Sequence, residues 1–227
     1  MLNVVFLICC LPIVTIGASL TALHYVTLKM ARNEESYIIR SFFKSFKQNF
    51  KQATIINLIM LVLGAILYLD LNIVNYFGKP VSQILYILFI AFGIVYLMVF
   101  LYIYPVLAKF YNSIKNTFRN AFLMSIRHLP YTILMMVITA APVLLGIFVA
   151  QAFPFMILFY IMLGFATVAY INSRFFVKLF DNYIPEDAGK DTEENGEEKA
   201  IDTSIFSNLH PTELPKKDEK ESEDETH

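Results

Sequence analysis

Side chains that could carry out chemistry are scarce in the first 180 residues, which hold three acids and two histidines. These five residues are Glu34, Glu35, Asp70, His24 and His128. A hydrolase or a transferase needs a positioned nucleophile, a base or a metal ion. None of the five lies in HExxH or paired-acid spacing, and the sequence contains no GxxxxGK(S/T) phosphate loop, GxSxG elbow or CxxC pair. We therefore expect a protein that is not an enzyme, with no catalytic, cofactor-binding or metal-binding residues.

Asp70 is the one acid between Glu35 and Asp181. It stands at the end of an apolar segment, and two asparagines and a lysine follow at positions 72, 75 and 79. A carboxylate in this setting could bind a sugar hydroxyl, a cation or a proton. The pattern favours the simpler interpretation, in which Asp70 marks the end of a helix at the water boundary, and the binding role stays open as the alternative.

The first apolar segment is interrupted by Pro12 and Gly17. Discontinuous membrane helices often line solute sites, because the interruption frees backbone groups that can bind a ligand. We therefore name Pro12, Thr15 and Gly17, together with Asp70, as candidate functional residues. Asn57, which lies inside the second apolar segment, predicts a hydrogen bond between helices.

The overall composition is that of a membrane protein. Of the 227 residues 57% are hydrophobic, 15% aromatic and 16% charged, and the mean hydropathy is +0.57. A soluble domain is about 45–50% apolar and about 25% charged. Residues 1–180 hold 13 Lys and Arg against 3 acids, whereas residues 181–227 hold 5 Lys against 16 acids. This composition argues against a soluble domain, a secreted disulfide scaffold and a nucleic-acid-binding protein.

Five segments are long and apolar enough to cross a bilayer core of about 30 Å, which takes roughly 20 helical residues. The sequence thus predicts an all-α, polytopic helical bundle over residues 1–180, followed by a disordered acidic tail over residues 181–227. Ala18 and Ala22 have the small-xxx-small spacing of a helix-packing face. The predicted spans are about 2–28, 53–69, 81–104, 131–150 and 153–171.

The Lys and Arg residues predict the orientation, because positively charged loops stay in the cytoplasm. The first and third connections and the segment after the fifth span carry twelve cations, whereas the second and fourth connections carry only Lys79. The N-terminus is therefore expected outside and the C-terminal tail inside the cell.

Residues 39–52 combine an aromatic face with a basic one. The aromatic side chains recur with the 3–4 spacing of one helix face, and the cations recur beside them with the same period. This pattern is typical of a helix that lies among anionic lipid headgroups. The alternative is a cytosolic helix that packs on its own protein. The predicted surface residues are Arg40, Phe43, Lys44, Phe46, Lys47, Phe50 and Lys51.

Several stretches of residues 1–183 resemble the YesL-like family of bacterial integral membrane proteins. They are Leu11–Gly17, Thr21–Tyr25, Ser41–Ala53, Leu67–Asp70 and Arg127–Pro130. The resemblance implies a location in a bacterial plasma membrane. It also implies a truncated or misassigned start, because such proteins usually carry a stretch before the first span, and it marks the acidic tail as an addition. The family has no established biochemical activity. Its members tend to be encoded beside carbohydrate ABC uptake systems, which implies an association with sugar import.

Three functions follow as hypotheses. The first is a non-enzymatic accessory to carbohydrate uptake that contacts ABC transporter subunits. The second is a stand-alone small-solute transporter, for which the broken first span and Asp70 provide the motive. The third is a membrane-surface scaffold whose basic helix holds anionic lipid while the acidic tail recruits basic partners.

Overall fold

The computed structural model describes residues 1–34, 37–76, 78–110, 112–149 and 153–181. Every regular element among them is a helix, and five of these helical stretches are long and apolar enough to cross a membrane. The predicted fold class is thereby confirmed. The predicted disordered tail at residues 182–227 lies outside the described residues. The candidate spans are Ile13–Ala31, Ile38–Ile73, Val81–Lys109, Leu129–Phe148 and Phe153–Asp181.

The first predicted span consists of two helices joined by a short 3₁₀ turn. Helix α1 covers Leu2–Cys10, a 3₁₀ turn (η1) covers Ile13–Thr15, and helix α2 covers Ile16–Ala31. The chain breaks at Pro12, which has an extended backbone (φ −78°, ψ 129°) and no N–H to continue the helical ladder. The break lies at Pro12, one of the two residues expected to interrupt the predicted span of about 2–28, whereas Gly17, the other, lies inside α2.

The second predicted span belongs to a much longer helix. Helix α3 runs without interruption from Ile38 to Ile73, 36 residues, or about 54 Å at 1.5 Å per residue. It contains both the predicted basic helix of residues 39–52 and the predicted span 53–69. Asp70 lies within α3, so the helix ends at Ile73 and not at the carboxylate; a 3₁₀ turn (η2), Val74–Tyr76, follows.

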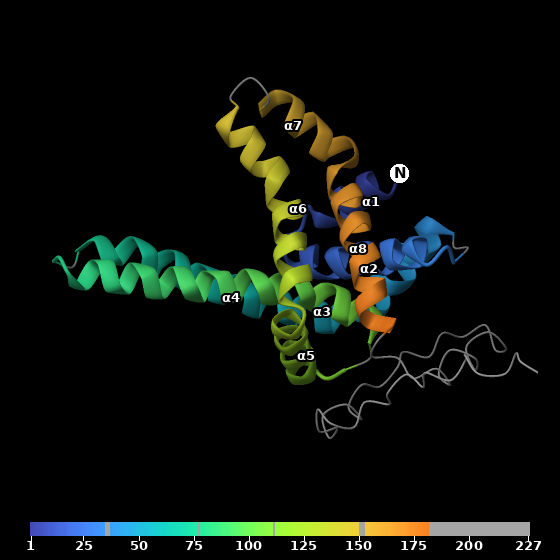
Figure 1. Cartoon of the computed structure of the whole chain (residues 1–227). Helices are drawn as coiled ribbons and strands as arrows, with labels where there is room; N and C mark the ends of the chain where they lie inside the picture. Colours follow the sequence, from blue (N-terminus) through green and yellow to red (C-terminus); the bar gives the residue numbers. More distant parts are fainter. Residues whose placement is uncertain (35–36, 77, 111, 150–152, 182–227) are drawn as a thin grey trace, which may run out of the picture.

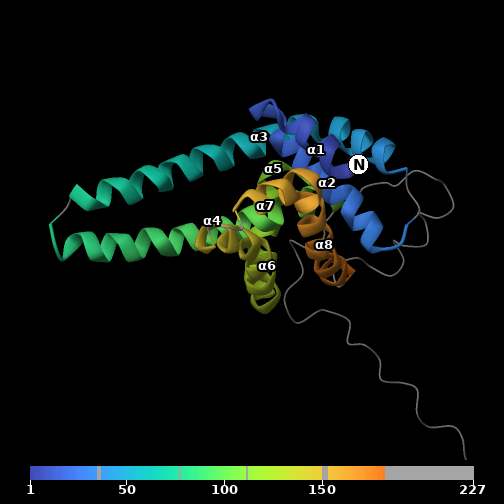
Figure 2. The ribbon, with the colours of Figure 1, turned by 90° about the horizontal axis from the view of Figure 1, so that it is seen from above.

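Helix α4, Val81–Lys109, returns beside α3 and makes a hairpin with it (Figure 2). The sequence predicts an end at Tyr104, but the helix continues through Pro105. Proline is tolerated inside membrane helices when neighbouring groups satisfy the freed carbonyl. Pro105 is buried in the core of the protein.

The C-terminal half begins with a short helix, α5, Ile114–Arg127, whose first turn is capped by the Ser113 hydroxyl. The second hairpin follows, and its last element extends ten residues beyond the predicted end at residue 171. Its elements are α6 (Leu129–Phe148), α7 (Phe153–Phe159), a π-helical segment, η4 (Tyr160–Gly164), and α8 (Phe165–Asp181).

The side chain of Asn3 on α1 fastens that helix to the π-helical segment. Its amide nitrogen donates to the carbonyl oxygens of Tyr160 (2.8 Å) and Ile161 (2.7 Å). Its amide oxygen accepts a hydrogen bond from the backbone N–H of Ala166 at 3.1 Å. Asn3 thus supplies partners to backbone groups in and beside the π-helical segment, where the regular α-helical ladder is interrupted.

Helix α2 lies at the centre of the fold and contacts α3, α4 and α8 (Figure 1). Ala18 and Ala22 on this helix are fully buried, as the small-residue spacing predicts. The two hairpins leave the shared core in different directions, so their far ends do not pack on one another. The packed core therefore occupies one end of each hairpin, and the rest of each hairpin exposes apolar side chains.

Candidate functional site

At the break between α1 and α2, side chains of the protein itself donate hydrogen bonds to backbone carbonyls. The Thr15 hydroxyl lies 2.6 Å from the carbonyl oxygen of Cys9 and 2.7 Å from that of Pro12. On α3, Thr54 donates to the carbonyl oxygen of Val14 at 3.3 Å. Lipid offers no hydrogen-bond partner, so backbone carbonyls freed within a membrane must be satisfied internally. The candidate residues Pro12 and Thr15 are thus placed together, with partners already provided.

Asn57 is the residue that links this break to the rest of the fold. Its amide nitrogen donates to the carbonyl oxygen of Ile13 at 3.4 Å, and its amide oxygen accepts from the Tyr104 hydroxyl at 3.0 Å. The predicted interhelical hydrogen bond of Asn57 is confirmed. Gly17 packs against the same point, because a Cβ added there would lie only 2.6 Å from the Asn57 Cβ. The position of Gly17 is therefore one of close helix packing.

Asp70 does not join these residues. It lies thirteen residues beyond Asn57 on the same helix, about 20 Å along the axis and three residues before the end of α3 at Ile73. Its side chain is partly exposed, and Lys79 nearby is exposed. The structure therefore separates the four candidate residues between a helix break and the end of α3, and the four do not form one site.

The basic face of α3 is exposed along its whole length, at Arg40, Lys44, Lys47 and Lys51. The aromatic face beside it is partly buried against the protein and partly exposed. Phe46 and Phe50 are half-buried against the protein core, whereas Phe43 is 41% exposed. For much of the aromatic face, this packing favours the alternative of a helix that packs on its own protein. Contact of the cations with lipid headgroups stays a prediction.

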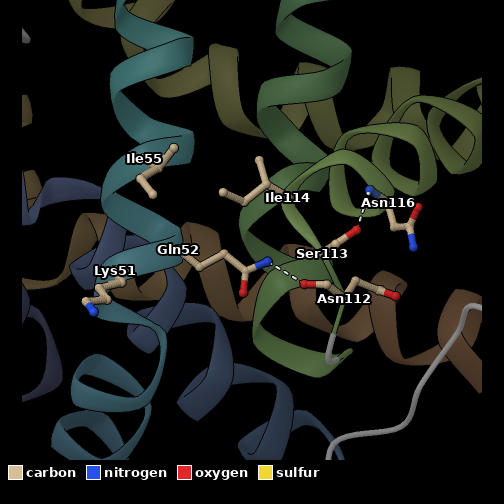
Figure 3. Close-up of a pocket in the computed structure, with 7 residues that line it drawn as sticks. All are labelled: Lys51, Gln52, Ile55, Asn112, Ser113, Ile114 and Asn116. Atoms are coloured by element: carbon tan, nitrogen blue, oxygen red, sulfur yellow. Dashed lines mark hydrogen bonds between the residues drawn. The ribbon is translucent and has the colours of Figure 1, made fainter.

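A shallow groove of about 520 Å³, lined by both polar and apolar side chains, lies between α3 and the start of α5 (Figure 3). Gln52 on α3 crosses it and donates to the carbonyl oxygen of Asn112 at 2.5 Å. The Ser113 hydroxyl accepts from the Asn116 backbone N–H at 3.4 Å. These side chains offer neutral donors and acceptors beside one cation, Lys51. The sequence could not indicate this groove, because its two walls are separated by about sixty residues. The lining residues are Lys51, Gln52, Ile55, Asn112, Ser113, Ile114 and Asn116.

Near the end of α2, Lys29 pairs with Glu34 at 4.0 Å and Arg32 pairs with Asp181 at 2.5 Å. No group of three His, Cys, Asp or Glu residues within the described part of the chain is arranged to hold a metal ion. His24 lies edge-on to the Phe176 ring with centroids 6.4 Å apart, and Cys9 and Cys10 are free thiols. At the start of α6, burial and the neighbouring Arg127 lower the pKa of His128.

Comparison with known proteins adds a family match without an activity. A family model described as "Protein of unknown function, DUF624" matches residues 1–71, the part that contains α1, α2 and most of α3. The uncharacterised protein YteU of Bacillus subtilis is 24% identical over 135 residues, which is 59% of this chain and 60% of that protein. The chain thus spans less than two thirds of that relative's length. No solved structure matches it. The protein is similar to an uncharacterised family of membrane-like helical proteins, and the matched region includes the YesL-like stretches from Leu11 to Asp70.

Proposed function

We propose that this protein is a non-enzymatic membrane subunit that assembles with the membrane domains of an ABC-type transporter and assists carbohydrate uptake. The observation that carries the proposal is the unequal burial of the candidate spans. In Ile13–Ala31, 50% of the apolar 18-residue stretch that could cross a membrane is buried inside the protein. In Val81–Lys109, only 6% of the corresponding stretch is buried. A helix with so little contact to its own chain offers its surface to lipid or to the helices of a partner.

The exposed hairpins suit a partner subunit better than an enclosed pathway. The buried share of the apolar 18-residue stretch is 17% in both Ile38–Ile73 and Leu129–Phe148. It is 11% in Phe153–Asp181. Helices that line a solute path within one chain must face one another around it. Here the hairpins diverge instead, so their apolar surfaces stay open for other helices.

The finer parts of the proposal have narrower support. Carbohydrate as the transported class is supported by the YesL-like resemblance alone. Location in a bacterial plasma membrane, with the N-terminus outside and the tail in the cytoplasm, is supported by the same resemblance and by the alternation of basic connections. Contact with anionic headgroups is supported by the exposed cations of α3.

Site-specific photocrosslinking tests the assembly on a matched pair of tyrosines in α4. Tyr86 is 49% exposed, whereas Tyr102 is fully buried. Benzoylphenylalanine at position 86 should crosslink to a transporter membrane subunit in cells grown on an inducing glycan, and the same group at position 102 should give no intermolecular adduct. Lipid adducts alone at position 86, together with failure of any transporter subunit to copurify, would refute the proposal.

The structure removes much of the motive for a stand-alone transporter. The break at Pro12 is attractive as a ligand site because of its backbone carbonyls, but those of Cys9, Val14 and Ile13 accept hydrogen bonds from Thr15, Thr54 and Asn57, respectively. The remaining candidate, Asp70, stands apart near the end of α3.

A further inference from the structure

Helix α5 has two opposite faces with different surroundings. One face, which includes Thr117, Ala121 and Met124, is buried, and α5 packs against α4. The opposite face exposes a stripe at the spacing i, i+4, i+7, i+11, which keeps its members on one side of a helix. The four residues of this stripe are Lys115, Arg119, Phe122 and Ile126.

The stripe changes from basic to apolar along the helix. Its two cations come first, and its apolar end consists of Phe122, which is 40% exposed, and Ile126, which is 45% exposed. Leu123, next to them, is 51% exposed. Large apolar side chains exposed in a group outside the candidate spans indicate a surface that is covered by something other than water.

The apolar end of the stripe adjoins a candidate span. Helix α5 ends at Arg127 and α6 begins at Leu129, so only His128 separates them. In Figure 1, α5 lies at the lower end of α6. At the start of α6, the apolar residues Leu129 and Ile133 are also exposed, at 42% and 52%. The apolar end of α5 is therefore next to the start of a candidate membrane span.

The positive charge of α5 indicates which kind of surface would cover its exposed face. The helix carries three cations, Lys115, Arg119 and Arg127, and no acid. A helix with cations beside exposed phenylalanine, leucine and isoleucine has the composition of one that lies at the headgroup–acyl boundary of an anionic leaflet.

We propose that the exposed face of α5 is a lipid-binding surface, with Phe122, Leu123 and Ile126 inserted at the level of the acyl chains nearest the headgroups. Lys115 and Arg119 lie among the headgroups and select anionic phospholipid over zwitterionic phospholipid. This surface is independent of the proposed partner subunit, which would contact the hairpins.

The experiment uses the full-length protein, which has no tryptophan. Phe122→Trp therefore introduces a unique fluorescent probe, and Leu123→Trp is a second probe should the first variant fail to fold. Phe92→Trp is the matched control, because Phe92 is 55% exposed in the uncharged part of α4. Each variant is reconstituted in phosphatidylcholine vesicles that contain a fraction of brominated phosphatidylcholine or brominated phosphatidylglycerol.

We expect bromine near the headgroup end of the acyl chain to quench the F122W probe strongly, and aqueous iodide to quench it weakly. Phosphatidylglycerol should be preferred over phosphatidylcholine at the F122W probe and not at the F92W probe. Each cation near an anionic surface contributes a factor of roughly five. The double substitution K115Q/R119Q should therefore lower the preference at the F122W probe up to about 25-fold, while the depth of that probe stays the same.

Three results would overturn the proposal. Strong iodide quenching of the F122W probe without bromine quenching would place α5 in water. Protection of the probe from both quenchers would mean that protein covers this face. Equal quenching by the two brominated lipids, unchanged in K115Q/R119Q, would remove the selectivity for anionic lipid.

Discussion

Replacement of Gly17 by alanine tests whether α2 and α3 are as closely packed as the structure indicates. The added Cβ would lie 2.6 Å from the Asn57 Cβ and 3.1 Å from the carbonyl carbon of Ala53. Carbon atoms in ordinary contact are about 3.5–4.0 Å apart. Because the obstacle includes the backbone of α3, a side-chain rotation cannot relieve it, and the two helices must separate by several tenths of an ångström to about 1 Å.

The change in the free energy of unfolding combines two destabilising effects with one stabilising effect. Overpacking of a well-packed core typically costs about 1–3 kcal/mol, and a separation of about 0.5–1 Å also forfeits roughly a quarter to a half of the dispersion energy of the neighbouring contacts. Alanine recovers about 0.5–1 kcal/mol of helix propensity relative to glycine. We therefore expect Gly17→Ala to lower the free energy of unfolding by about 1–2 kcal/mol.

The measurement is reversible unfolding in mixed micelles as the SDS fraction is raised, followed by circular dichroism. Gly93→Ala in α4 is the control, because an added Cβ there meets nothing within 4 Å. The control variant should be unchanged or more stable by up to about 1 kcal/mol through helix propensity. If Gly17→Ala is as stable as Gly93→Ala, the close approach of α2 and α3 at this point is refuted.

Three further predictions concern buried polar groups. Asn57→Leu should cost about 1–2 kcal/mol in the same unfolding assay, because it removes the bonds to the helix break and to α4; an unchanged midpoint would contradict this role. Asn3→Leu should speed amide hydrogen exchange at residues 160–166 by releasing α1 from the π-helical segment; equal rates would argue against the attachment. Thr132→Val, nearly isosteric, should cost about 1 kcal/mol because its hydroxyl lies 2.8 Å from that of Tyr102, whereas a more stable variant would show that the bond contributes nothing.

The number of spans could be predicted from the sequence, but several helix boundaries could not. Hydropathy separates residues 39–52 from residues 53–69, since one segment is basic and the other apolar. The backbone does not follow this separation, because no proline or glycine occurs in the helix between Ile38 and Gly64. At Pro105 the sequence predicts a helix end that the structure does not show. The proline, a residue that usually ends a helix, is instead accommodated inside the core.

The candidate residues differ in how far the sequence could place them. Thr15 and Gly17 are near the predicted interruption, and the structure does bring them to a common point. The other side of that point could not be found in advance, because Thr54 and Asn57 come from another helix. For the same reason the sequence could not show that Asp70 is about 20 Å from Asn57 along α3.

The polar residues inside the apolar body serve the interruptions of the helical backbone. Thr15, Thr54 and Asn57 satisfy carbonyls at the Pro12 break, and Asn3 satisfies the backbone at the π-helical segment. Each break would otherwise expose backbone groups to lipid, at a cost of several kcal/mol apiece. Because these polar side chains already have backbone partners, their presence does not argue for a solute path. Both proposals therefore rest on outward surfaces, which are the apolar hairpins, the basic face of α3 and the mixed face of α5.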